Sequence, residues 1–262
     1  MIAPKTTAVP PARGLLPLAL LLVLWQLSNP SSPYLPPPTA WAQALGHLWS
    51  GGALLPAIAA TLLTFALALG TAIALGIGVG LLVGGARRAD RALGPSLEFA
   101  RAMPPAAVVP IATLLLGYSQ QMKVAVVASG AIWPILLSTR AAVRRLDPVL
   151  LETARSLHLT RWQRLLKVTL PALAPGMFLG VRLGAPIALV VTLLVEFLTQ
   201  VDGVGGLIAT AQRSYLSAEV WGLILLAGLF SVSFNSLVAA IEARIFSSRT
   251  GSARRRRGRA AR

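Results

Sequence analysis

The chain has no cysteine, only two histidines and only eight acidic side chains among its 262 residues. The absence of cysteine excludes disulfide bonds and thiolate metal sites. The histidines, His47 and His158, are too far apart in sequence for a helical His-x-x-x-His site, so no metal ion is predicted. No G-x-x-x-x-G-K-[ST] pattern occurs, which excludes a P-loop nucleotide site, and no cofactor is predicted.

Charged residues are scarce as well. They make up 12% of the chain, whereas about 25% is usual in soluble domains. Apolar residues make up 55%, and the mean hydropathy is +0.72. These values predict an all-α fold, a polytopic membrane bundle of about six transmembrane helices. The apolar segments fall at residues 14–29, 53–84, 96–118, 122–140, 175–200 and 219–246.

The first apolar segment is short and follows Lys5 and Arg13, as the hydrophobic part of a signal peptide would. No convincing small-x-small cleavage site follows it, so an uncleaved helix is the favoured interpretation. In the outer loop that comes next, Trp41 and Trp49 are predicted to lie at the lipid headgroups on a short interfacial helix. The predicted organisation is an N-terminus with the first helix, a proline-rich outer loop, a transmembrane core and a disordered basic tail, at 1–29, 30–52, 53–246 and 247–262.

The uneven placement of lysine and arginine predicts the orientation of the chain. Most of the 24 basic residues fall at the two termini and in the connections after the second and fourth apolar segments. Only Lys123 and Arg213 fall in the outer segments, while Arg101 and Arg182 lie near the inner ends of helices. The positive-inside rule therefore predicts a multi-pass protein of the cell (inner) membrane with both termini in the cytoplasm.

The net charge of +16 raises the question of nucleic-acid binding. The arginine-rich segment 254–259 could contact RNA or DNA, but it follows six apolar segments. Anionic membrane lipid is therefore the predicted neighbour of this tail, and no nucleic-acid partner is predicted.

A polar stretch at residues 147–171 interrupts the apolar core between the fourth and fifth segments. Asp147 and Pro148 form an N-cap and first helical position, so a helix is predicted with Leu150, Ala154 and Leu157 on one face. Thr160 and Gln163 form a capping box for a second short helix, which Pro171 is predicted to end. His158 lies between the two helices, where a left-handed residue is expected.

Residues 152–171 resemble the EAA loop of ATP-binding cassette (ABC) importer permeases, whose pattern is Glu-Ala-Ala, three residues, Gly, nine residues, Ile-x-Leu-Pro. Glu152 and Ala154 match, as do Val168, Leu170 and Pro171, whereas Thr153 replaces an alanine and His158 replaces the glycine. In that family the loop receives force from a separate ATPase. The resemblance implies that the residues coupling this chain to an ATPase are Asp147, Glu152, Ala154, Arg155, His158, Leu159 and Pro171. The alternative interpretation is an amphipathic surface hairpin without a partner.

Further motifs resemble one group of these permeases, which imports nitrate, taurine, aliphatic sulfonates and related solutes. They are Tyr34 with the three prolines at 36–38, Arg101 with Pro104, Pro105, Pro110 and Gly117, Asp147-Pro148, and Glu196 with Gly203 and Gly205. The likeness runs from about residue 30 to residue 246. It implies a type I permease subunit, a homodimer, two cytoplasmic ABC ATPase subunits and an extracytoplasmic solute-binding protein. The substrate itself stays open.

The translocation pathway is predicted to involve Pro104, Pro105, Pro110, Gly117 and Glu196. The three prolines cannot all lie in one unbroken helix, and a broken helix at membrane depth either lines a wet pathway or packs as a kink against a neighbour. Glu196 is the one acid deep within an apolar segment, and such acids usually face the protein interior or water. It either shapes the pathway or caps a helix. The glycines at 70, 76, 78 and 80 are predicted to allow close helix packing.

Two other classes of protein compete with an importer subunit. An integral-membrane enzyme would need a catalytic constellation, but no two acids stand at helical i, i+3 or i, i+4 spacing and no base is identifiable for a serine or threonine. An ion-coupled secondary transporter typically shows an internal repeat with paired broken helices, and no such repeat is evident. A transport subunit without enzymatic activity of its own is the prediction.

Overall fold

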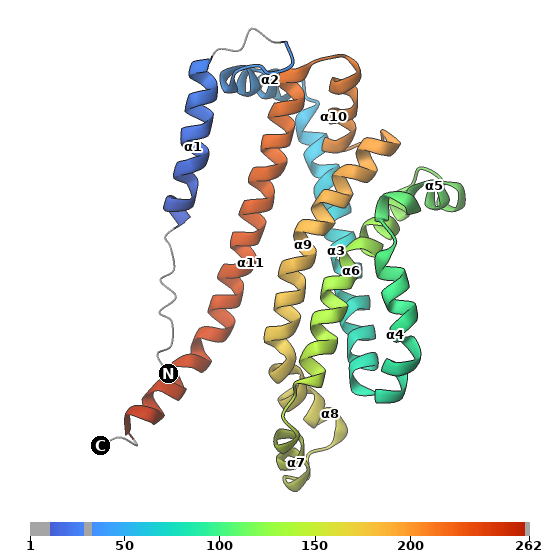
Figure 1. The fold of residues 1–262 in the computed structure, drawn as a ribbon, viewed down its shortest axis with the longest axis vertical. Helices are drawn as coiled ribbons and strands as arrows, with labels where there is room; N and C mark the ends of the chain where they lie inside the picture. Colours follow the sequence, from blue (N-terminus) through green and yellow to red (C-terminus); the bar gives the residue numbers. More distant parts are fainter. Residues whose placement is uncertain (1–10, 29–32, 260–262) are drawn as a thin grey trace.

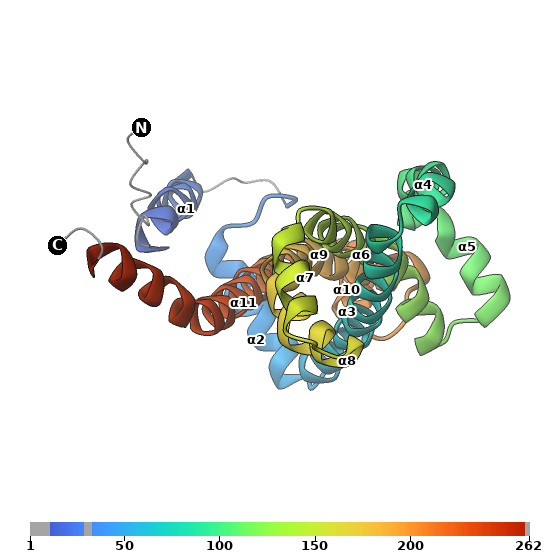
Figure 2. The same cartoon turned by 90° about the horizontal axis from the view of Figure 1, so that it is seen from below.

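The chain folds into a helical bundle around three long helices. The computed structural model describes residues 11–28 and 33–259, so the first ten residues, residues 29–32 and residues 260–262 lie outside the described part of the chain. The central helices are α3 (Leu54–Gly85), α6 (Gln120–Arg144) and α9 (Leu170–Thr199), which run side by side in both views (Figures 1 and 2). The predicted all-α class is confirmed: no strand occurs in the described residues.

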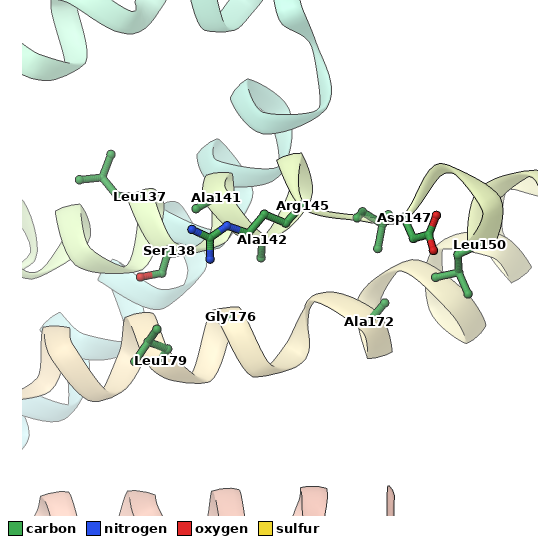
Figure 3. A pocket seen from close by; sticks show the side chains of 11 residues that line it. Leu137, Ser138, Ala141, Ala142, Arg145, Asp147, Leu150, Ala172, Gly176 and Leu179 are labelled. Atoms are coloured by element: carbon green, nitrogen blue, oxygen red, sulfur yellow. The ribbon is translucent and has the colours of Figure 1, made fainter. Parts of the chain in front are cut away.

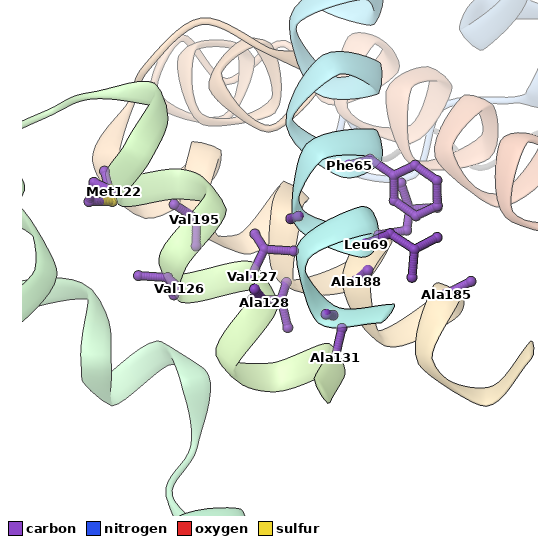
Figure 4. Packing of buried hydrophobic residues seen from close by; sticks show 14 of the residues in the cluster. Phe65, Leu69, Met122, Val126, Val127, Ala128, Ala131, Ala185, Ala188 and Val195 are labelled. Carbon is purple, nitrogen blue, oxygen red and sulfur yellow. The ribbon is translucent and has the colours of Figure 1, made fainter. Parts of the chain in front are cut away.

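Small and branched apolar side chains fill the space between the three central helices. Phe65 and Leu69 of α3, Val126 and Val127 of α6, and Val195 of α9 belong to one buried cluster (Figure 4). Alanines of all three helices complete it. This packing gives the three helices a common core, from which the remaining elements extend.

Two rows of glycine bring α3 and α9 into close contact with neighbouring faces of α6. On α3, Gly76, Gly80 and Gly84 recur every fourth residue, and a Cβ added at Gly80 would lie 2.8 Å from Cβ of Thr139 and 2.9 Å from the carbonyl oxygen of Leu136. On α9, the glycines at 176, 180 and 184 repeat this spacing against α6. Such spacing lets helix backbones approach closely in a membrane, where van der Waals contact rather than the hydrophobic effect drives helix association.

The prediction about the glycines of α3 is correct at Gly76 and Gly80 and wrong at Gly70 and Gly78. A Cβ added at Gly70 or Gly78 would meet no atom within 4 Å. The reason is the period of the helix, because positions two residues apart lie on nearly opposite faces, and only one of these faces α6.

Three tryptophans from distant parts of the chain join the outer elements. They are Trp25 of α1 (Pro11–Ser28), Trp41 of α2 (Pro38–Ser50) and Trp221 of α11 (Ser217–Arg259). Trp41 stacks on Trp221 with ring centroids 5.5 Å apart, and Trp25 meets both rings edge-on. The short helix predicted after the proline-rich segment exists as α2, but Trp41 is buried in this cluster instead of facing the headgroups. Its indole N–H donates to the carbonyl of Pro36.

The third apolar segment is two helices rather than one. They are α4 (Arg87–Ala102) and α5 (Pro105–Leu116), and the chain bends by 91° between them. Pro104 is the N-cap of α5 and Pro105 occupies its first position, where a missing N–H breaks no helical bond. The break predicted from the prolines is therefore present, and it lies at Met103 and Pro104.

Within the described residues, four helices are long and apolar enough to cross a membrane, and the bent pair α4–α5 would make a fifth span. These correspond to the second to sixth predicted segments, while the first coincides with α1, which is not among them. α11 continues to Arg259, so helix occupies much of the segment 247–262 where disorder is predicted. Alanine and arginine favour helix, and the two isolated glycines there are not enough to end it.

The ends of the bundle carry different short helices. α2 and α10 (Val204–Arg213) lie at one end, whereas α7 (Pro148–Ser156) and α8 (Arg161–Arg164) project from the other (Figure 1). The C-terminal part of α11 reaches toward the same end as α7 and α8 (Figure 1).

Candidate functional site

The connection between α6 and α9 begins with a capped helix. Asp147 is the N-cap of α7, and its Oδ1 accepts a hydrogen bond of 2.9 Å from the backbone N–H of Val149. Pro148 takes the first helical position. The predicted start of this helix is confirmed, and it follows from two adjacent residues that satisfy or remove the free N–H groups of a helix N-terminus.

A left-handed turn at His158 links α7 to α8. His158 has φ 49°, as predicted for the position where the family pattern carries glycine. Beyond it, Thr160 and Gln163 form the predicted capping box: the N–H of Thr160 donates to Oε1 of Gln163 and the N–H of Gln163 donates to Oγ1 of Thr160. Ala154 is buried, whereas Leu150 and Leu157 of the predicted apolar face are exposed.

The prediction that Pro171 ends the second helix is wrong. α8 leads into a π turn at Leu165–Thr169, named η1, and α9 begins at Leu170 with Pro171 in its first turn. The N–H of Leu170 reaches back to the carbonyl of Leu165, five residues before. This wider turn accommodates a proline that would otherwise clash with the carbonyl four residues earlier, so the helix continues through it.

The tip of this connection exposes large apolar side chains beside charged ones. Trp162 is 71% exposed, Leu157 67% and Val149 63%. Glu152 and Arg155 are exposed on α7 next to them. A mixture of exposed aromatic, aliphatic and charged side chains on a short, well-capped hairpin is typical of a protein contact surface.

A groove of about 660 Å³ lies at the root of the same connection. Its walls come from the end of α6 and the start of α9, and Asp147 and Leu150 of α7 close one end (Figure 3). Ser138, Ala142 and Gly176 keep it wide because their side chains are small or absent, and Arg145 is its basic group. The groove therefore opens where the predicted coupling loop meets the membrane helices.

Glu196 lies in a second polar cluster at the opposite end of the bundle. Its side chain is fully buried, and Oε2 accepts hydrogen bonds from Oγ1 of Thr61 at 2.8 Å and from the N–H of Gly205 at 3.1 Å. The hydroxyl of Thr61 in turn accepts from the N–H of Val204. Glu196 and Thr61 together thus cap the N-terminus of α10, where a carboxylate also meets the favourable end of the helix dipole.

Gly203 makes this arrangement sterically feasible. Its φ of 147° is open to glycine alone among ordinary residues, and a Cβ there would overlap the carboxylate of Glu196. Lys123 is also buried close by, and its ammonium group donates to the carbonyl of Asp202 at 3.4 Å. Of the two roles considered for Glu196, the contacts describe the helix cap, and a role in the pathway stays a prediction.

The remaining predicted pathway residues lie on or beside α5. Pro105 packs where a Cβ on Gly130 of α6 would touch its ring, and Pro110 lies exposed within α5. Gly117 ends α5 with φ 63°, and its N–H donates to the carbonyl of Thr113. These residues lie in α5 or at its two ends, and their part in a pathway stays a prediction.

Several partners in these clusters are not predicted from the sequence. Thr61 precedes Glu196 by 135 residues, so no local pattern could join them. The ion pairs of Asp90 with Arg140 and Arg144 also join residues that are too far apart in sequence for a local pattern. Gly203 is named together with Glu196 in the sequence motif, but the motif does not show that the two residues are in contact.

Comparison with known proteins identifies a matching family and several relatives of this chain. The family model described as "Binding-protein-dependent transport system inner membrane component" matches residues 72–249. A putative aliphatic sulfonates transport permease of Bacillus subtilis is 30% identical over 239 residues, which cover 89% of this chain and 86% of that protein. A nitrate import permease of Leptolyngbya laminosa is 32% identical over 200 residues, covering 76% of this chain and 69% of that protein.

One solved structure also shares the fold. It is described as an amino acid ABC transporter with histidines, and it superposes with a TM-score of 0.61 at 16% sequence identity. The match covers 76% of this chain and 97% of that chain. At this identity the likeness concerns the helical architecture alone.

Proposed function

Because this chain belongs to the binding-protein-dependent transport permeases, the inner-membrane components of ABC importers, we propose that it forms the membrane pathway of an importer for a small solute such as nitrate, taurine or an aliphatic sulfonate. Like its relatives, it is a multi-pass transport subunit and not an enzyme. Separate ATPase subunits supply the energy, and a solute-binding protein delivers the solute from outside.

The exposed loop between α6 and α9 is the observation that carries this proposal. This loop carries the sequence pattern of the family's ATPase contact on a hairpin of two short helices. Asp147 caps the first helix, and the Thr160–Gln163 capping box caps the second. Trp162 and Leu157 extend from that hairpin into solvent, where a soluble subunit can cover them. One ATPase subunit docked on each loop of a permease dimer gives two per transporter.

A second copy of the chain is the proposed partner within the membrane. α9 exposes Leu179, Leu183 and Val190 along one side, and Leu179 also lines the groove beside α6. Two such faces opposed across a two-fold axis would enclose a pathway between the copies, the usual arrangement for identical subunits. ATP-driven closure of the cassettes would then shift the pair between inward-open and outward-open states.

The predicted orientation places the loop in the cytoplasm together with both termini. α7, α8 and the end of α11 lie toward one end of the bundle, as this orientation requires (Figure 1). Since the chain lacks cysteine, Ser156→Cys in the loop and Ser217→Cys at the start of α11 provide single reporters. An impermeant thiol reagent is expected to label Ser217→Cys from outside intact cells and Ser156→Cys only after the membrane is opened. Outside labelling of Ser156→Cys would reverse the topology.

The function is tested by separating the chain from its ATPase. Purified chain in proteoliposomes is expected to show no ATP hydrolysis and no uptake, because it has no P-loop. Addition of the co-expressed cassette subunit, the solute-binding protein and ATP is expected to produce uptake of radiolabelled taurine, ethanesulfonate or nitrate. Uptake by the chain alone, driven by an ion gradient, would instead establish the secondary transporter that competes with this proposal.

The proposed substrate class rests on two of the relatives, whose names refer to sulfonates and nitrate, two kinds of anion. The buried carboxylate of Glu196 contributes no site for such a solute, because it repels anions and already occupies the N-terminus of α10. Calorimetric titration of the cognate solute-binding protein with nitrate, ethanesulfonate, taurine and an uncharged control tests the class. Tight binding of the control alone would contradict it.

A further inference from the structure

α4 is anchored to the bundle by a charge instead of an apolar face. Among the described residues of α4, Asp90 is the one that is buried, with a side chain 8% exposed. A surface helix normally buries an apolar stripe against its neighbours, and a buried carboxylate is unfavourable unless it is paired. The position of α4 therefore depends on the partners of Asp90.

Both partners of Asp90 come from the last turns of α6. Nη2 of Arg140 contacts Oδ1 of Asp90, and Nη2 of Arg144 lies 2.9 Å from Oδ2. The two arginines are four residues apart and so lie on one face of α6, which lets each one take a different carboxylate oxygen. Arg140 is largely buried, with 19% of its side chain exposed, whereas Arg144 is half exposed. One carboxylate thus joins α4 to two successive turns of α6.

The close contact of α3 with α6 places Asp90 in reach of these arginines. A Cβ at Gly84 would lie 2.9 Å from Cβ of Val143 and 3.1 Å from Cα of Arg140, so the end of α3 touches α6 at this level. α4 starts three residues later, at Arg87. Its first turn therefore lies beside the end of α6. Asp90 is in this first turn, where its negative charge also interacts favourably with the positive end of the α4 helix dipole.

The ion pairs connect the predicted coupling loop with the bent pair α4–α5. α6 ends at Arg144, and only three residues separate it from α7. At the far end, α4 bends into α5, whose Val109 and Ala112 belong to the central core. A movement of α7 is passed directly to the end of α6. It reaches the first turn of α4 through the α3 connection and through Asp90, and it reaches the far end of α4 through α5, where Pro105 packs at Gly130 of α6.

We propose that Asp90 is a positioning residue that makes α4 move together with α6 when ATP drives the transporter between its states. The proposal rests on the proposed function, because it needs an ATPase acting on the loop. Two ion pairs on one buried carboxylate make the joint stiff, since each arginine restricts the same side chain from a different turn. Without the carboxylate, α4 keeps its covalent connections and loses its fixed position against α6.

The test measures distances between the two copies in the assembled transporter. Spin labels on Leu93→Cys report α4 and labels on Leu183→Cys report α9, each in a chain without other cysteines. Both are measured without nucleotide and after trapping with ATP and vanadate. In Asp90→Asn the α9 labels are expected to shift as in the unaltered chain, whereas the α4 labels lose their defined shift and broaden. ATPase binding is expected to remain.

Glu98→Gln is the matched control, because Glu98 lies on the same helix and also pairs with an arginine. Its partner, Arg101, is on α4 itself, and Glu98 is 56% exposed, so its loss should leave both shifts intact. Arg140→Gln and Arg144→Gln remove the pairs from the α6 side and are expected to weaken the α4 shift without altering α4.

Two outcomes overturn the role of Asp90: an unchanged α4 shift in Asp90→Asn, or equal loss in Glu98→Gln. Should Asp90→Asn fail to insert, an unchanged α4 shift in both arginine variants overturns it as well. A missing α9 shift in the unaltered chain contradicts the proposed function instead, so the two failures are separable.

Discussion

Replacement of Glu152 by lysine is expected to lower ATP-driven uptake about tenfold or more. The reversed charge would repel the ATPase surface that accepts Glu152, and such repulsion weakens docking by about one to several kcal/mol, where about 1.4 kcal/mol corresponds to a factor of ten. Glu152 is exposed on α7 and makes no ion pair within the described chain. Its own contribution to folding stability should therefore stay below about 1 kcal/mol. The measurement is cassette co-purification and uptake at matched amounts of inserted protein.

His158→Gly is the companion variant in the same loop. It removes a side chain from a residue at φ 49° and so relieves left-handed strain of about 1 kcal/mol. Coupling is expected to persist or to improve slightly. Full coupling in Glu152→Lys together with lost coupling in His158→Gly would contradict the docking role of α7.

The second large effect is expected at Gly80. Gly80→Leu forces a branched side chain between α3 and α6 at a point where even a Cβ would lie 2.9 Å from the backbone oxygen of Leu136. Overpacking a tight core usually costs about 1–3 kcal/mol, and backbone contact puts this variant at or above the upper end. We expect little monodisperse protein in detergent and a strongly lowered midpoint of thermal unfolding.

Gly78→Leu provides the control two residues away on the same helix. A Cβ there meets nothing within 4 Å, and leucine is at home on a lipid-facing surface. This variant should elute and unfold like the unaltered chain. If both variants behave alike, close contact through the glycine row is not what holds α3 against α6.

Local chemistry explains which features could be predicted from the sequence. The cap at Asp147, the left-handed His158 and the capping box of Thr160 and Gln163 all involve residues at most three positions apart. Their hydrogen bonds form whatever the rest of the chain does. The break before Pro105 is local for the same reason, because proline restricts its own φ and the residue before it.

The sequence-based predictions are wrong where contacts between distant residues, or a rare helix geometry, determine the structure. A proline signals a helix end, but the π turn at Leu165–Thr169 lets the chain continue through Pro171. Trp41 is of a residue type that is common at membrane interfaces, yet it stacks on Trp221, 180 residues later in the chain. Asp90 likewise reads as an ordinary first-turn acid until the fold brings Arg140 beside it. Hydropathy and local residue spacing do not predict such pairings between distant residues.

The central claim is that the loop between α6 and α9, and not the opposite end of the bundle, receives the ATPase. It is tested most directly by site-specific photo-crosslinking in membranes that contain the whole transporter. A photoreactive phenylalanine at Trp162 and one at Tyr215 replace two aromatic side chains that are 71% and 80% exposed at opposite ends. We predict that the Trp162 position crosslinks to the cassette subunit and the Tyr215 position does not. A cassette crosslink at Tyr215, with none at Trp162, would contradict the account.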